Sequence, residues 1–213
     1  MSTASNPACL TVSAEKFSTT LPRRNFLIRS AAGLLGIPLA SAIYRKEDFD
    51  VLLQDGDARA AVVVHTNPIT VAAYSDEFDA VILLRIPEEQ CAGLNLRIGS
   101  KMISVFNYLP SMNTPRDIFM GEYAGDEFRN AEPLIGDVLS DDVDRLQELR
   151  ESISEAEWER ARQLGEAGIS ARPNLYRLHK PGSTRGIAGD LWIMILAGVI
   201  FIAALVVGLW MFA

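Results

Sequence analysis

The sequence predicts an α+β domain, with a small, partly antiparallel sheet of four or five strands followed by two helices, and one C-terminal transmembrane helix. Three observations support this fold class. Short apolar runs separated by turn residues fill the first half of the central region, and segments with helical spacing fill the second. Residues 191–213 are continuously apolar. The chain has 213 residues, so its central part is long enough to form one hydrophobic core.

The strands are expected at five apolar runs: 60–64, 69–74, 80–86, 94–98 and 101–108. The polar residues 75–79 between the second and third runs predict a hairpin. The next region, 110–136, shows no clear period. We therefore expect it to form a long ordered loop or a set of short turns.

Two helices are expected after this region. Ser140 precedes two aspartates, whose charges suit a helix N-terminus, and apolar residues continue at helical spacing to Ile153. Ser154 then begins a capping box, in which the Glu157 carboxylate is expected to reach back to the cap. Gly168 is expected to end this second helix.

The segment 191–213 carries no charge and no proline. As a helix of 23 residues it would be about 34 Å long, enough to cross a hydrocarbon core of about 30 Å. Trp192 and Trp210 lie near its two ends, where indole rings favour the membrane interface. The sequence therefore predicts a single membrane anchor here, preceded by a basic linker, 171–190.

Near the N-terminus, a pair of arginines is followed by two hydrophobic residues, a weakly apolar stretch and an A-x-A pattern. The residues concerned are Arg23, Arg24, Phe26, Leu27, Ala40 and Ala42. In these features the segment 1–42 resembles a twin-arginine export signal, which implies that the domain folds before it crosses the cytoplasmic membrane of a bacterium. Two features depart from the usual signal: Pro22 replaces the expected Ser or Thr, and the basic residue expected after Leu27 is displaced to Arg29. An ordinary helix beginning at Pro22 is the alternative.

Charge is distributed unevenly between these parts. Residues 43–170, the predicted domain, contain 12 Lys and Arg against 25 Asp and Glu, a balance of −13, whereas both flanks are basic. A nucleic-acid partner is not expected, because neutralising phosphates requires a basic face. The expected partners are membrane lipid and proteins that contact the acidic domain.

Two features of the sequence predict opposite locations for the domain. The export signal predicts the outer, periplasmic side of the cytoplasmic membrane. The basic residues of the linker 171–190 predict the cytoplasmic side, because such residues are retained there. We favour the outer side, because this location also accounts for the N-terminal segment. A cytoplasmic tail-anchored protein is the alternative.

Two acidic segments are candidates for a cation site. Asp55-Gly56-Asp57 resembles the start of a calcium loop, but the ligands expected at later positions are missing, so a turn with solvated carboxylates is expected. Asp76, Glu77 and Asp79 are expected to form an exposed acidic turn.

Two further side chains are candidates for catalysis. His65 follows an apolar run and is expected to bond to the backbone at a strand end. Cys91 follows acidic residues, which raise the pKa of a thiol and argue against a reactive thiolate. The sequence contains no motif for a metal or a cofactor, and none is expected. It therefore favours a non-catalytic interaction or structural domain, with an anchored enzyme whose pocket lies in 110–136 as the alternative.

Overall fold

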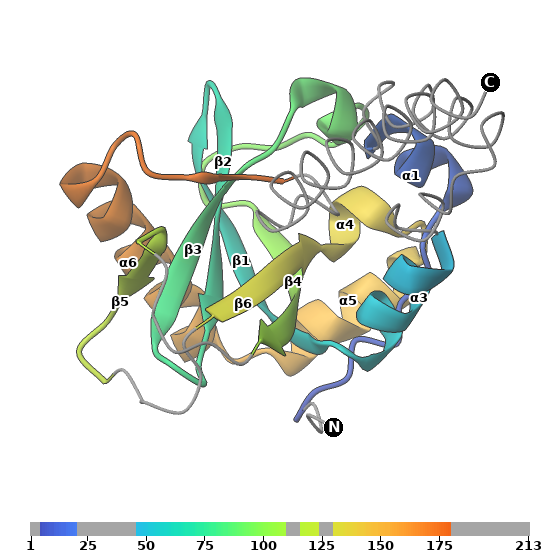
Figure 1. Ribbon diagram of the computed structural model, residues 1–213, viewed down its shortest axis with the longest axis horizontal. Coiled ribbons are helices and arrows are strands. Elements are labelled where there is room, and N and C mark those ends of the chain that lie inside the picture. Colours follow the sequence, from blue (N-terminus) through green and yellow to red (C-terminus); the bar gives the residue numbers. More distant parts are fainter. Residues whose placement is uncertain (1–4, 21–45, 110–115, 124–129, 180–213) are drawn as a thin grey trace, which may run out of the picture. The chain divides into compact units, whose positions relative to one another are not determined.

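The computed structural model describes residues 5–20, 46–109, 116–123 and 130–179, which belong to one unit of the chain (Figure 1). The helices are α1 (Ala14–Thr20), α3 (Lys46–Asp55), η2 (Glu88–Cys91), α4 (Gly136–Leu139), α5 (Val143–Ser152) and α6 (Glu155–Ala171). The strands are β1 (Asp57–Thr66), β2 (Ile69–Ser75), β3 (Ala80–Arg85), β4 (Lys101–Leu109), β5 (Ile118–Met120), β6 (Asn130–Ile135) and β7 (Arg177–Leu178).

The strands form one sheet in the order β5-β3-β2-β1-β4-β6, with antiparallel neighbours, and the short β7 adds parallel to β3. Strands β2 and β3 form the hairpin predicted around residues 75–79, with Ser75 opposite Ala80. The first eight residues of β1 are buried. This strand is covered on both faces, which explains why its central residues are apolar without alternation.

The sheet curls, so that its two edges approach each other. In β7, the guanidinium of Arg177 donates to the carbonyl oxygen of Ala131 in β6 at 2.6 Å. The N–H of Ile135 donates to Nε2 of His179 at 3.1 Å. The side chains of Arg177 and His179 therefore link the edge of the sheet at β3 and β7 to the edge at β6.

Two apolar clusters lie on the two faces of the sheet. On one face, α6 packs against β1, β2 and β3, and α5 packs against β4, with Trp158 and Leu146 buried beneath them. On the other face, Phe78, Ile82 and Phe106 are buried within the curl. Burial on both faces leaves the ends of the strands as the places where polar side chains gather.

The predicted sheet of four or five strands is wrong. The sheet has seven strands instead of four or five, and the strand predicted at 94–98 does not form. Strands β5 and β6 lie in the region predicted to be a loop, and β6 contains Pro133. An edge strand tolerates a proline, and β6 is at the edge, because its partner is β4 alone in the strand order. Helices α1 and α3 also precede the sheet.

No helix within the described residues is long and apolar enough to cross a membrane. The transmembrane helix predicted at 191–213, with Trp192 and Trp210, falls outside these residues. The predicted targeting residues also fall outside them: Arg23, Arg24, Phe26, Leu27, Ala40 and Ala42.

Candidate functional site

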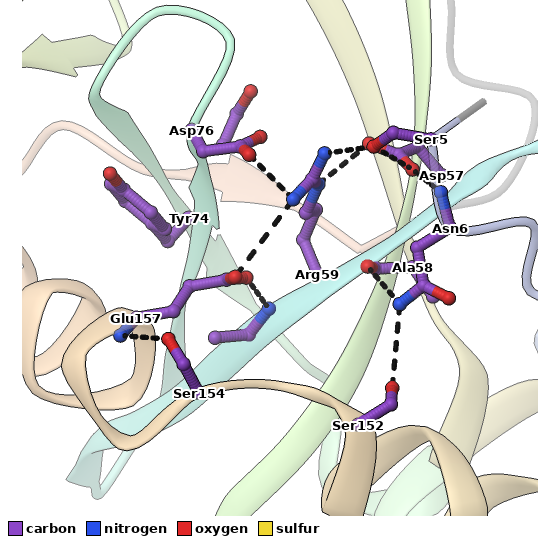
Figure 2. Close-up of polar contacts among 12 residues, drawn as sticks. Ser5, Asn6, Asp57, Ala58, Arg59, Tyr74, Asp76, Ser152, Ser154 and Glu157 are labelled. Carbon is purple, nitrogen blue, oxygen red and sulfur yellow. Dashed lines mark hydrogen bonds and ion pairs between the residues drawn. The ribbon is translucent and has the colours of Figure 1, made fainter. Parts of the chain in front are cut away.

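A network of charged side chains gathers at one end of the sheet (Figure 2). Because β1 and β2 are antiparallel, the start of β1 lies beside the turn that follows β2. The N-terminus of α6 approaches the same end and brings Glu157. We call Asp57, Arg59, Asp76 and Glu157 the Arg59 network.

Arg59 is the centre of this network and is 8% exposed. Its Nε lies 2.6 Å from Oδ2 of Asp57, and its Nη1 lies 2.6 Å from Oδ2 of Asp76. Burial lowers the pKa of the guanidinium, but the two aspartates more than offset this effect and leave the pKa raised. Arg59 is therefore a permanent buried cation held between carboxylates.

The helix cap of α6 positions the third carboxylate. Ser154 Oγ accepts a hydrogen bond from the N–H of Glu157 at 3.2 Å, so the predicted N-cap is confirmed. The Glu157 carboxylate, however, accepts from the N–H of Ala60 in β1 at 2.9 Å and lies 3.9 Å from Arg59 Nη1. Glu157 thus joins the helix to the sheet, whereas the sequence predicted that its carboxylate would bond back to the cap of the helix. Burial raises the pKa of both Glu157 and Asp76.

One group of carboxylates here has the spacing of a metal site. Ligand atoms of Asp57, Asp76 and Glu77 lie within 4.8 Å of one another. Arg59 already bonds to two of these three carboxylates, so a divalent ion would have to share them with a fixed positive charge. The group keeps a net negative charge, since one guanidinium faces several carboxylates, but two of its three carboxylates are already bonded to Arg59, and we do not assign a cation to it.

A second ion pair joins Asp79, in the predicted acidic turn 76–79, to Arg160 of α6. Asp76 and Glu77 are exposed as predicted, but Asp79 is 4% exposed. Its carboxylate accepts from Arg160 Nη2 at 2.6 Å and from Arg160 Nε at 2.9 Å. The hydroxyl of Tyr74 and the N–H of Tyr123 also donate to it. The bonds from Arg160 hold the pKa of Asp79 below its usual range.

A buried histidine lies at the opposite end of β3. His179 is 2% exposed, and both of its ring nitrogens are engaged. Nε2 accepts from the N–H of Ile135, so the proton lies on Nδ1, which donates to Oε1 of Gln90 at 2.9 Å. Burial lowers the pKa of His179 to about 4. This histidine lines a hollow together with Leu84, Glu132, Pro133, Leu134, Arg177 and Leu178.

The other candidate residues are single side chains, apart from these networks. His65 Nδ1 lies 3.1 Å from the carbonyl oxygen of Pro68, which confirms the predicted backbone bond. Cys91 is buried, and its pKa is raised to about 11, first by burial and then by the charge of Glu89. The predicted direction is correct, but burial is the larger cause. Asp57 is 2% exposed, so the solvated turn predicted at residues 55–57 is wrong for this residue.

Sequence reasoning missed the Arg59 network, although a signal for it was present. Asp57 and Arg59 are two residues apart at the start of an apolar strand, so their side chains point to the same face. Two opposite charges in such a position indicate a buried ion pair. No comparable signal exists for Asp79 and Arg160, which are 81 residues apart in the chain.

Comparison with known families, with characterised proteins and with solved structures finds no match for this chain.

Proposed function

We propose that this protein is a non-catalytic binding domain for a basic protein segment, attached to a bacterial cytoplasmic membrane and facing its outer side. The charge distribution of α5 and α6 is the observation that carries the proposal. The attachment and the side of the membrane rest on the sequence features of the two terminal segments.

Eight exposed carboxylates line α5, α6 and the turn before them: Asp141, Asp142, Asp144, Glu148, Glu151, Glu155, Glu159 and Glu166. We call this set the acidic helical surface. Two of the arginines on these helices point away from it, toward carboxylates of other elements. Arg150 pairs with Asp137 of α4, and Arg160 pairs with Asp79. The surface therefore keeps a net negative charge, although both helices contain arginines.

Five of the eight carboxylates have a cationic partner: Asp141 pairs with Lys16, Glu148 with Arg145, Glu155 with Lys101, and Glu159 and Glu166 both pair with Arg162. The surface therefore holds eight negative charges against four positive ones. Such exposed ion pairs contribute little to stability, so a partner can displace them at small cost. A basic segment would be attracted by the summed field of the surface and would bind more weakly as salt increases.

The ionisable groups described above support a binding role better than catalysis. Within the described part of the chain, the Asp57 and Asp79 carboxylates are each engaged by an arginine. The thiol of Cys91 is buried with a high pKa, and His179 is buried and neutral. Groups fixed in this way stabilise a fold, because the two carboxylates are paired with arginines and both ring nitrogens of His179 are bonded.

The binding role can be tested with an oligolysine peptide of ten residues and two variants that remove equal charge. The first variant carries Asp144→Asn, Glu148→Gln and Glu151→Gln. The control carries Glu77→Gln, Glu88→Gln and Glu89→Gln, three exposed carboxylates elsewhere. We expect salt-dependent binding by calorimetry that weakens roughly tenfold in the first variant and changes little in the control. An equal loss in both variants, or no binding by the wild type, would overturn the proposal.

The location can be tested by adding protease to intact spheroplasts that carry the wild-type chain or Arg23→Lys with Arg24→Lys. We expect the wild-type domain to be accessible and the double variant to be protected. Protection of both forms would contradict an outer location.

A further inference from the structure

The N-terminal residues 5–20 form contacts that a removable signal segment would not make. We propose that these residues are a permanent part of the folded domain, and that the twin-arginine segment is therefore retained in the mature protein instead of being removed after Ala42. This inference is independent of the partner that the acidic helical surface binds.

The main chain of the N-terminal residues completes the end of α3. The last carbonyl groups of a helix have no partner within the helix. Here the N–H groups of Leu10, Cys9 and Ala8 donate to the carbonyl oxygens of Leu53, Gln54 and Gly56, at distances of 3.2, 3.2 and 3.0 Å. Removing the segment would leave these carbonyl groups without their partners.

The same residues also continue into the sheet. The N–H of Ala58, at the start of β1, donates to the carbonyl oxygen of Asn6 at 2.8 Å, and Pro7 forms a bridge with Asp57. The segment therefore bonds to both α3 and β1, which only Gly56 separates.

Apolar side chains of the segment are part of the core. Ala8 and Leu10 are 0% exposed, and Val12 is 4% exposed. The ring of Phe17 in α1 packs against that of Phe49 in α3, with centroids 5.3 Å apart. Loss of these side chains would expose the apolar cluster beneath α5 and α6 to water.

Polar groups of the segment complete the Arg59 network (Figure 2). Ser5 Oγ accepts from Arg59 Nη2 at 2.6 Å, and the N–H of Asn6 donates to Oδ1 of Asp57 at 2.8 Å. Asp57 is almost fully buried, so without the segment its carboxylate would lose this hydrogen bond and part of its cover from water.

Further along, the segment is bonded to the helical layer. Arg145 of α5 donates to the carbonyl oxygens of Ala8 and Pro7, each at 3.0 Å. The ammonium of Lys16 donates to the carbonyl oxygen of Ser140 at 2.6 Å. The segment thus contacts α3, β1 and α5, and each contact belongs to the same cooperative fold.

The twin-arginine segment interrupts the sequence of the domain. The segment with Arg23, Arg24 and the A-x-A pattern lies between residues 5–20 and α3, both of which are packed in the domain. Cleavage after Ala42 would separate two parts of one core. An export route that carries folded domains, as the resemblance implies, does not require this cleavage.

The decisive experiment is an intact-mass measurement with N-terminal sequencing on the full chain, purified from bacterial membranes and denatured. We expect a single chain that still contains residues 5–42 joined to the rest of the domain. A mature N-terminus at Ile43 would overturn the inference, whether or not the released segment stays bound.

A pair of adjacent substitutions tests the packing itself. Leu10 is fully buried and Thr11 is exposed, so Leu10→Asp and Thr11→Asp place the same charge at neighbouring positions. We expect Leu10→Asp to lower the melting temperature by roughly 10 °C or more, or to abolish cooperative unfolding, and Thr11→Asp to change it by about 2 °C or less. Equal melting temperatures for the two variants would contradict a packed N-terminus.

Discussion

Replacing Asp79 by Asn should destabilise the domain strongly, because it removes a buried charge and leaves its partner in place. The Asp79 carboxylate accepts two hydrogen bonds from Arg160, one from the Tyr74 hydroxyl and one from the Tyr123 N–H. Asparagine has nearly the same shape and tolerates the left-handed backbone of this position, where φ is 40°. The substitution therefore changes charge and hydrogen bonding with little change in packing.

The magnitude follows from the exposure of the two partners. Removing one member of a buried ion pair costs about 3–5 kcal/mol, because the other charge stays unpaired. The Arg160 side chain is 26% exposed and the Asp79 side chain 6%, so water can compensate part of the loss. We expect Asp79→Asn to lower the free energy of unfolding by about 3 kcal/mol. In a domain of this size, that corresponds to roughly 6–12 °C in melting temperature.

Denaturant unfolding at several pH values measures this effect. The folded-state pKa of Asp79 is lowered, so its contribution is fully present above the unfolded pKa of about 4 and is lost as the pH falls through the folded value. The difference between wild type and Asp79→Asn should therefore narrow below about pH 4. A loss of less than about 1 kcal/mol at pH 7, or a difference that persists unchanged to pH 3, would refute this reasoning.

A control on the same helix separates the buried pair from exposed ones. Arg160→Met breaks the pair with Asp79, whereas Arg162→Met removes an exposed arginine that bonds Glu159 and Glu166. We expect no measurable change in stability for Arg162→Met, because exposed ion pairs contribute little. Asp79→Asn combined with Arg160→Met should lose less than the sum of the two single changes.

Three further predictions concern the core and the titrating groups. In thermal unfolding, Gly165→Ala should destabilise the domain by about 1–3 kcal/mol, because the new Cβ would lie 2.5 Å from the Cβ of Ala72. Gly168→Ala should instead stabilise α6 by up to about 1 kcal/mol, because its new Cβ would lie no closer than 3.4 Å to Phe119. Equal effects of the two substitutions would contradict this packing. The pKa of His179 is lowered from 6.5 to about 4, so its neutral ring should contribute up to about 3 kcal/mol to the free energy of unfolding above pH 6.5, and this contribution should be lost as the pH falls toward 4. In denaturant unfolding, the stabilities of wild type and His179→Gln should therefore converge over this range. A constant difference between them would be evidence against a buried neutral ring. In thiol labelling of the folded protein, the exposed Cys9 should react and the buried Cys91 should react only after unfolding, and labelling of Cys91 in the native state would show that its site opens.

The sequence by itself determined the features that depend on neighbours a few residues away. The turn between β2 and β3 is polar between two apolar runs, and the hairpin forms there. Ser154 caps α6 because its hydroxyl needs only the N–H three residues later. His65 bonds to the carbonyl oxygen of Pro68 for the same local reason.

The tertiary structure alone decided the features that join distant residues. Strand β6 forms in spite of Pro133, because the edge of β4 offers it a pairing partner. The carboxylate of Glu157 accepts from the N–H of Ala60, and not from the cap of its own helix, because α6 packs on β1. Three other features depend in the same way on how the hairpins and helices pack together. They are the Asp79–Arg160 pair, the bond of His179 to β6, and the packing of residues 5–20. Local patterns cannot specify such contacts, because their free energy arises from burial that exists only in the assembled core.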